Sequence, residues 1–304
     1  MNVVDRFNVD GRNNPVEPLR QCIRSDSVVA ESGIRPKKVL HVLNSAGGGA
    51  ALSTIGLIEA LRGAGVSACA VCHDAGSSAE REQLREATDG EVLFTPLYWW
   101  NRKIRAAAWK RPLIELRQLW RTGWTRGSTA AVAEFAQRRH ADLIHTNTIL
   151  NPEGGIAARR LGLPHVWHLR ELLGPEQPFR LRKQPPAIAR YMRKYASIVV
   201  ANSEISAATA AGAIPLEMML VVPNGIELRR FSATGDDRSA RHLLIVGMVA
   251  SLSSRTKKHA LFVEAVARLK DLNNVEFRIY GHDSTAGGTR SGDRYATEIH
   301  AMIR

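Results

Sequence analysis

Short apolar runs alternate with helical segments along most of the chain, and this alternation restricts the fold more than any other feature. The runs are continuous, which is typical of strands buried on both faces of a sheet. The expected strands cover 37–44, 66–73, 91–96, 141–146, 164–170, 196–202 and 219–223. The expected helices cover 51–62, 79–88, 128–139, 153–161, 186–195 and 204–212. The pattern predicts an α/β fold with a mostly parallel, doubly wound sheet and helices on both faces.

A second α/β unit follows the polar linker 232–239. It opens with the apolar strand 242–251 and continues with one helix, one strand and one more helical stretch before Arg304. Compact domains usually contain about 100–150 residues. We therefore expect one complete domain over 37–235 and only the beginning of a second over 236–304. Residues 1–36 lack apolar periodicity and are expected to form a mobile tail.

The formal net charge is +13 and the pI is near 10.2, which favours an anionic partner such as nucleic acid, acidic lipid or a phosphorylated substrate. No apolar run approaches the roughly 20 residues of a membrane span. The first residues lack the apolar core of a secretory signal. The expected location is therefore the cytoplasm.

Two of the three cysteines, Cys69 and Cys72, lie in the apolar run 66–73. Positions i and i+3 of a strand point to opposite faces, so these thiols are not placed to share a metal ion or a disulfide. The expectation is that both are small buried apolar side chains in a reducing compartment.

A run of three glycines, Gly47, Gly48 and Gly49, separates the first strand from the first helix. Glycines let backbone N–H groups approach a ligand, and the helix N-terminus behind them favours an anion. The run matches neither the dinucleotide fingerprint nor a P-loop. A tight turn without a ligand is an equally good interpretation.

The strand 164–170 ends in His-Leu-Arg-Glu, at the edge where parallel sheets bind ligands. His168 can hydrogen-bond a hydroxyl as a neutral imidazole, and Glu171 can hold a sugar or orient a basic group. These two are the candidate catalytic residues. The alternative is a structural histidine beside a surface ion pair.

Two further motifs follow along the chain. Asn224 and Gly225 form a tight turn after the strand 219–223. Arg255 and Lys257 lie between the first strand and first helix of the second unit, where a lysine can reach a diphosphate as a point charge. A solvated basic loop is the commoner interpretation of such a segment.

Taken in order over roughly 38–300, these motifs resemble a GT-B glycosyltransferase of the large retaining family 4, which uses nucleotide-sugar donors. The matching segments are the first strand with its glycine loop, His168 in the H-x-R-E strand end, Asn202-Ser203-Glu204, Val222 to Ile226 with Phe231, and Lys257 to Ala265. The resemblance implies two Rossmann-like domains and transfer of a sugar to a lipid-linked or saccharide acceptor.

The resemblance also implies roles for single residues. The glycine loop and His168 would line the acceptor side, and Lys257 matches the family's donor-phosphate lysine. Ser251 stands where the family usually has an arginine, a position for which Arg255 would compensate. A UDP- or GDP-sugar is the implied substrate, with no metal ion. The family's paired-glutamate motif would lie beyond Arg304, so we expect a truncated donor domain and impaired activity.

The segment 98–127 is rich in tryptophan and basic residues, with Glu115 as its one acid. A second stretch, 179–194, contains no acidic residue. This composition suits an anionic membrane interface, which predicts a peripheral protein on the inner face of the membrane. It could also bind single-stranded nucleic acid by stacking and phosphate contact. Core tryptophans beside a solvated basic face are the structural alternative.

Two other functions stay open on the sequence. One is a non-catalytic, truncated glycosyltransferase remnant. The other is a basic nucleic-acid-binding protein, although no nucleic-acid fold signature accompanies the charge and no specific nucleic acid is expected. An NAD-dependent oxidoreductase is disfavoured because the glycine loop lacks the dinucleotide fingerprint.

Overall fold

The computed structural model describes residues 36–98, 101–102, 126–173, 180–181, 185–231, 243–252, 255–269, 271–281 and 290–303. The chain divides into two compact units, the first ending at Glu227 and the second beginning at Leu228. Nearly all of the predicted tail 1–36 and most of the insertion 98–127 lie outside the described residues.

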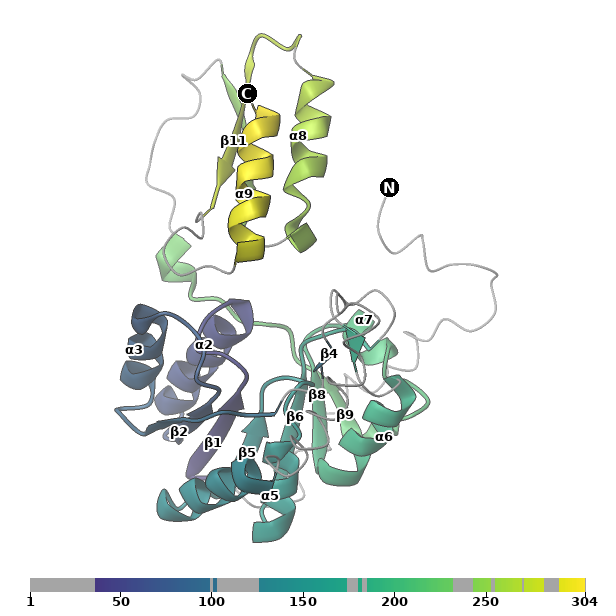
Figure 1. The fold of residues 1–304 in the computed structure, drawn as a ribbon. Helices are drawn as coiled ribbons and strands as arrows, with labels where there is room; N and C mark the ends of the chain where they lie inside the picture. Colours follow the sequence, from purple (N-terminus) through teal and green to yellow (C-terminus); the bar gives the residue numbers. More distant parts are fainter. Residues whose placement is uncertain are drawn as a thin grey trace. The chain divides into compact units, whose positions relative to one another are not determined.

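Seven parallel strands form the sheet of the first unit, in the order β3-β2-β1-β5-β6-β8-β9 (Figure 1). They are β1 Lys38–Leu43, β2 Ser67–Cys72, β3 Val92–Phe94, β5 Leu143–Thr146, β6 His165–Leu169, β8 Ile198–Ala201 and β9 Met219–Val221. Along the chain, β2 and β3 are added outward on one side of β1, and the next strand of this sheet, β5, is added on the other side of β1. The topological switch point therefore lies between β1 and β5, where open α/β sheets bind their ligands.

Helices cover both faces of this sheet, which confirms the predicted doubly wound fold. They are α2 Gly49–Gly63, α3 Ser78–Ala87, a helix over 126–138, α5 Glu153–Leu161, α6 Pro185–Tyr195 and α7 Glu204–Ala208. Leu40 and Val42 of β1 pack with α5 and the helix 126–138, whereas Leu43 packs with α2 and α3. Alternate residues of one strand thus fill two separate cores.

The two cysteines of β2 follow the same alternation. Cys69 lies in the core formed with α5, and Cys72 lies in the core formed with α2 and α3. Burial raises the pKa of both thiols to about 12, so both stay protonated at neutral pH. The prediction that they face opposite sides of the sheet is confirmed.

Local capping explains where several helices begin and end. Ser77 and Glu80 form a reciprocal capping box that starts α3. Gly162, with φ of 68°, ends α5 in the left-handed conformation. The prediction of a helix over 204–212 was too long, because α7 ends at Ala208. The chain turns there through Gly212, whose φ is 79°.

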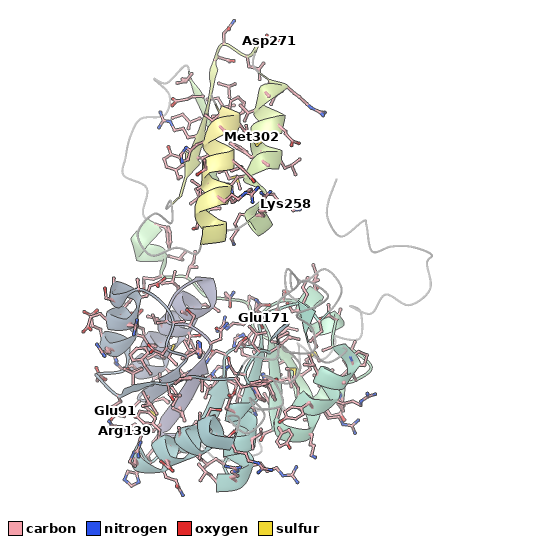
Figure 2. The ribbon with its side chains drawn as sticks, viewed as in Figure 1. Glu91, Arg139, Glu171, Lys258, Asp271 and Met302 are labelled. Carbon is pink, nitrogen blue, oxygen red and sulfur yellow. The ribbon has the colours of Figure 1, made fainter. Side chains whose placement is uncertain are left out.

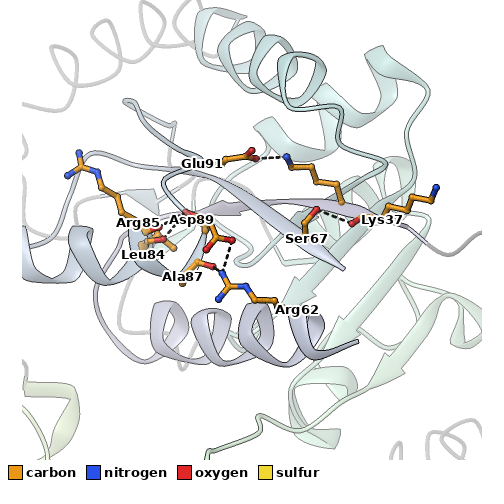
Figure 3. A network of polar contacts seen from close by, with 10 residues as sticks. Lys37, Arg62, Ser67, Leu84, Arg85, Ala87, Asp89 and Glu91 are labelled. Atoms are coloured by element: carbon orange, nitrogen blue, oxygen red, sulfur yellow. Dashed lines mark hydrogen bonds and ion pairs between the residues drawn. The ribbon is translucent and has the colours of Figure 1, made fainter. Parts of the chain in front are cut away.

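A polar network ties together the amino ends of the strands (Figure 3). Lys38 pairs with Glu91 at 2.5 Å, and Arg62 of α2 contacts Asp89 at 3.2 Å. The carboxylate of Asp142 accepts hydrogen bonds of 2.9 Å from the N–H groups of Lys37 and Lys38. That carboxylate joins the start of β1 to the residue before β5, which sets the register of the central strand pair.

A buried carboxyl group holds both ends of the basic insertion. Glu153, fully buried at the start of α5, accepts hydrogen bonds from the Tyr98 N–H and the Ser128 hydroxyl. Burial raises the pKa of Glu153 to about 7. Within the insertion, β4 Asn101–Arg102 pairs antiparallel with β7 Arg180–Leu181. The two basic stretches singled out in the sequence are therefore neighbours in space.

The second unit contains a pair of parallel strands, β10 Leu244–Val249 and β11 Val275–Tyr280. Two helices follow them in the chain, α8 His259–Ala267 after β10 and α9 Arg290–Ile303 after β11. Tyr295 and Ile299 of α9 form a small core with Leu252. This is the order of elements expected from the sequence: strand, helix, strand, helix.

Candidate functional site

The candidate site lies at the carboxyl ends of the parallel strands of the first unit. The glycine loop follows β1, and Asn147 follows β5 next to the switch point. Arg170 and Glu171 follow β6, and Asn224 lies beyond the end of β9. Residues from four strand ends are thereby brought to one edge of the sheet, as the sequence predicts for a parallel α/β fold.

Each glycine of the loop has a different environment. A Cβ on Gly47 would lie 1.9 Å from Oε1 of Glu80, so a larger residue there would displace the end of that side chain. Gly48 precedes α2 with φ of 86°, and Gly49 begins the helix in open surroundings. The first turn of α2 carries no acidic side chain. The loop thus leaves the N-terminus of α2 uncapped by any side chain.

Three histidines lie side by side on one face of the sheet. His41 of β1 pairs in register with His145 of β5, and their ring centroids are 5.1 Å apart. His168 of β6 stacks on His145, with centroids 5.5 Å apart and ring planes within 7°. All three are buried. Neither ring nitrogen of His168 has a hydrogen-bond partner in the described part of the chain.

Burial keeps these imidazoles neutral. It lowers the pKa of His41 and of His168 to about 3, with a smaller contribution from the nearby charge of Arg170. The pKa of His145 is lowered well below its usual value, again mainly by burial. His168 is therefore able to accept or donate a hydrogen bond at neutral pH as an uncharged imidazole, the form assumed in the sequence analysis.

Arg170 links the strand ends. One guanidinium nitrogen, Nη1, donates to Ser53 Oγ of α2 at 2.9 Å and to Asn224 Oδ1 at 2.8 Å. The other, Nη2, donates to Asn147 Oδ1 at 3.4 Å. Ser53 also donates to Asn224 at 3.0 Å. The sequence predicts a tight turn at Asn224 and Gly225, but residues 222–227 form no turn in the structure. Asn224 is instead held against α2 by this network. A Cβ added to Gly225 would meet open space.

Glu171, which is labelled in Figure 2, supports the neighbouring loop. One carboxylate oxygen accepts a 2.6 Å hydrogen bond from the Thr148 hydroxyl, and the other accepts a 3.1 Å bond from the Ile149 N–H. Burial raises the pKa of Glu171. Both oxygens are thus engaged in holding the turn after β5.

The predicted donor-side residues lie in the second unit, in the short helix Arg255–Lys257. Lys257 is exposed. Arg255 forms an ion pair with Glu298 of α9, and its guanidinium carbon lies 4.9 Å from the centre of the Tyr295 ring. Arg255 is therefore already engaged within its own unit, whereas the ammonium group of Lys257 reaches solvent.

Sequence reasoning missed His41, His145 and Arg170 as parts of the site. The sequence did contain a signal for two of them, since His41 and His145 are polar residues inside runs predicted to be buried strands. Among the described residues, no group of three or more potential ligands could hold a metal ion. None of the described helices has the length and apolar character that a membrane crossing requires.

Comparisons with known proteins agree with this architecture. A glycosyltransferase from Rickettsia africae has 14% identity and a TM-score of 0.58, over 89% of this chain and 65% of that protein. MnaA of S. aureus, solved with UDP, has 14% identity and a TM-score of 0.54, over 87% of this chain and 66% of that protein. The chain thus spans slightly less than two thirds of either structure. At this identity, the likeness bears on fold alone and supports the GT-B class.

A search of curated proteins gave no match. The model of one protein family, described as Glycosyltransferase Family 4, matches residues 47–230. The match begins in the glycine loop, includes His168, Arg170 and Asn224, and extends over more than half of the chain. The chain belongs to Glycosyltransferase Family 4.

Proposed function

We propose that this protein transfers a sugar from a nucleotide-sugar donor, a UDP- or GDP-sugar, to a saccharide or lipid-linked acceptor. The observation that carries the proposal is the family match over the same residues that gather at the carboxyl edge of the sheet. In this proposal the first unit binds the acceptor, and neutral His168 hydrogen-bonds a sugar hydroxyl. Lys257 of the second unit stabilises the charge that develops on the departing diphosphate.

The test is a donor-consumption assay with UDP- and GDP-sugars, in which released nucleotide is measured with and without a saccharide acceptor. Lys257→Ala is expected to lower the rate about a hundredfold, the usual effect of removing one group that stabilises transition-state charge. UDP-sugars are tested first because MnaA was solved with UDP.

Lys258→Ala is the matched control, because it removes the neighbouring exposed positive charge. It should keep most of the activity. Equal losses in both variants would indicate a general effect of local charge and would contradict the role of Lys257. Absence of nucleotide release by the wild-type protein with every donor would contradict the proposed function itself.

We further propose that the protein works at an anionic lipid surface. Arg190, Arg193 and Lys194 of α6 are exposed, as are Arg159 and Arg160 in the last turn of α5. Arg159 and Lys194 lie 5.6 and 5.5 Å from the ring centre of Tyr195, so the two helix ends adjoin. None of these five cations has an ion pair within the described ranges.

Replacing Arg190, Arg193 and Lys194 by glutamine should weaken binding to vesicles of phosphatidylglycerol and phosphatidylcholine about a hundredfold, since each basic residue near such a surface contributes roughly 1 kcal/mol. Co-sedimentation measures the partition coefficient, and binding should decline with salt. The control changes Arg62, Arg85 and Arg138, three arginines with ion-pair partners, to glutamine. Binding to a single-stranded oligonucleotide but not to vesicles would contradict the lipid assignment.

A further inference from the structure

Arg170 is a half-buried cation without a carboxylate partner. It forms no ion pair within the described part of the chain, and the acid whose charge acts on it is Glu171. Both oxygens of Glu171 accept hydrogen bonds elsewhere, from Thr148 and Ile149. The hydrogen-bond acceptors around the guanidinium are the neutral oxygens of Ser53, Asn147 and Asn224. Neutral acceptors do not cancel the positive charge, so the free-energy cost of burying this guanidinium is only partly offset.

Apart from Glu171, no acidic side chain in the described part of the chain acts on the charge of Arg170. His41, His145 and His168 lie close enough for its charge to lower their pKa values. A stable protein core would normally place a carboxylate beside such a cation. A cation that is only partly compensated, at the ligand-binding edge of a parallel sheet, is instead typical of a site that receives an anion.

Arg170 also retains unused donors. Its Nε is buried without a hydrogen-bond partner, and Nη2 makes one long bond of 3.4 Å. Asn224 is exposed, so the network around the guanidinium reaches the surface. Through Ser53 the network is joined to α2, whose first turn has no acidic side chain and no side-chain cap. The partial positive charge of that helix end has the same sign as Arg170.

We propose that Arg170, supported by Ser53, Asn147 and Asn224, binds an anionic oxygen group of the acceptor, either a phosphate or a carboxylate. A guanidinium fork matches the geometry of both groups. The assignment of this anion to the acceptor rests on the proposed function, whereas the anion site itself does not. This proposal narrows the expected acceptors to phosphorylated or acidic saccharides, including lipid-linked phosphates.

The experiment is calorimetric titration of the full chain with inorganic phosphate, glycerol phosphate, acetate and UDP. It is carried out in a Lys257→Ala background to remove the proposed donor-phosphate contact. We expect phosphate or glycerol phosphate to bind, and Arg170→Gln to weaken that binding at least tenfold. Arg138→Gln is the control, because it removes an exposed cation of the helix 126–138 that lies outside both proposed binding surfaces and should leave binding unchanged. Preference for acetate would identify a carboxylate acceptor.

A thermal unfolding measurement separates anion binding from a purely structural link. If the charge of Arg170 is only partly compensated, then without phosphate Arg170→Gln should unfold at the same temperature as the parent or at a higher one. Added phosphate should raise the unfolding temperature of the parent but not that of Arg170→Gln. A lowered unfolding temperature together with unchanged phosphate affinity would overturn the proposal. If the glutamine variant does not fold, Arg170→Lys serves instead, with weaker binding expected because its ammonium lacks the fork.

The outcomes for the two proposals differ. Absence of phosphate, glycerol phosphate and acetate binding in the parent overturns the anion site, whatever UDP does. A UDP affinity that depends on Arg170 would assign the cation to the donor and overturn the acceptor assignment. Phosphate binding that depends on Arg170, in a protein without nucleotide release from any donor sugar, would support the anion site while contradicting the proposed transferase function.

Discussion

Lowering the pH from 7 to 4.5 is expected to destabilise the first unit by about 5 kcal/mol, an amount comparable to the whole stability of many domains. Four histidines are buried as neutral groups: His41, His145, His165 and His168. The pKa of His41 and His168 is lowered to about 3 and that of His165 to about 4, in each case mainly by burial.

The sign follows from proton uptake. Between pH 6.5 and these lowered pKa values the unfolded histidines are protonated and the folded ones are not. The unfolded state therefore binds more protons, and stability decreases as the pH is lowered. His41, His165 and His168 each lose about 2.5 kcal/mol by pH 4.5. Glu153, whose pKa is raised to about 7, acts in the opposite direction and offsets about 2.5 kcal/mol of that loss. His145 adds to the loss, since its pKa is also lowered, and Glu171 acts against it, since its pKa is raised.

Guanidinium unfolding at pH 7 and pH 4.5 measures the difference directly. His168→Gln should reduce the pH dependence by about 2.5 kcal/mol, because glutamine fills the site with a group that does not titrate. Gln137→Ala, at an exposed position of the helix 126–138, is the control and should leave the pH dependence intact, because neither side chain titrates. A stability that stays constant between the two pH values would contradict the buried, neutral state of these imidazoles.

Trp167→Ala should destabilise the first unit by about 3–5 kcal/mol, the usual cost of removing a large aromatic side chain from a core. Trp167 is fully buried between β6 and α6, where it meets the Tyr191 ring edge-on at 6.1 Å. Its indole N–H donates a 2.8 Å hydrogen bond to the Thr148 carbonyl oxygen. The substitution therefore opens a cavity and leaves a buried carbonyl group without its donor.

Denaturant unfolding of Trp167→Ala and Trp167→Phe separates these two contributions. Phenylalanine retains most of the packing but loses the N–H group, so its cost should be nearer to 1–2 kcal/mol. Thr148 is held from one side by Trp167 and from the other by Glu171. A loss below 1 kcal/mol for the alanine variant would mean that the turn after β5 does not depend on this anchor.

The sequence was sufficient to predict the strands, because continuous apolar runs such as 196–202 have few alternative structures in an α/β chain. It also predicted the position of His168 and Asn224 at the carboxyl edge of the sheet, since both lie at the ends of predicted strands. It could not show that Arg170 joins Asn224 to Ser53, residues separated by 171 positions in the chain. Strand order and register create that contact, and neither can be read from apolar periodicity.

Glu171 shows why residue type alone does not determine a role. The sequence places an acid at the right edge of the sheet, and this is correct. Its oxygens, however, are taken by the turn Thr148–Leu150, which comes from the preceding strand of the sheet. Similarly, Arg255 has a suitable charge for a diphosphate, yet Glu298 from the last described helix engages it. In both cases the charged group contacts a partner from a distant segment of the chain, and apolar periodicity does not reveal such contacts.

The pairing of β1 with β5 has a consequence for biosynthesis. Val39 and Leu143 are partners in the sheet, so about a hundred residues must leave the ribosome before the central strand gains its second neighbour. Until then one edge of β1 is open, with Leu40 and Val42 lacking much of their final core. Non-local parallel pairing of this kind folds slowly and exposes apolar surface to aggregation. Nascent chains of this protein should therefore depend on chaperones until β5, which ends at Thr146, has been synthesised.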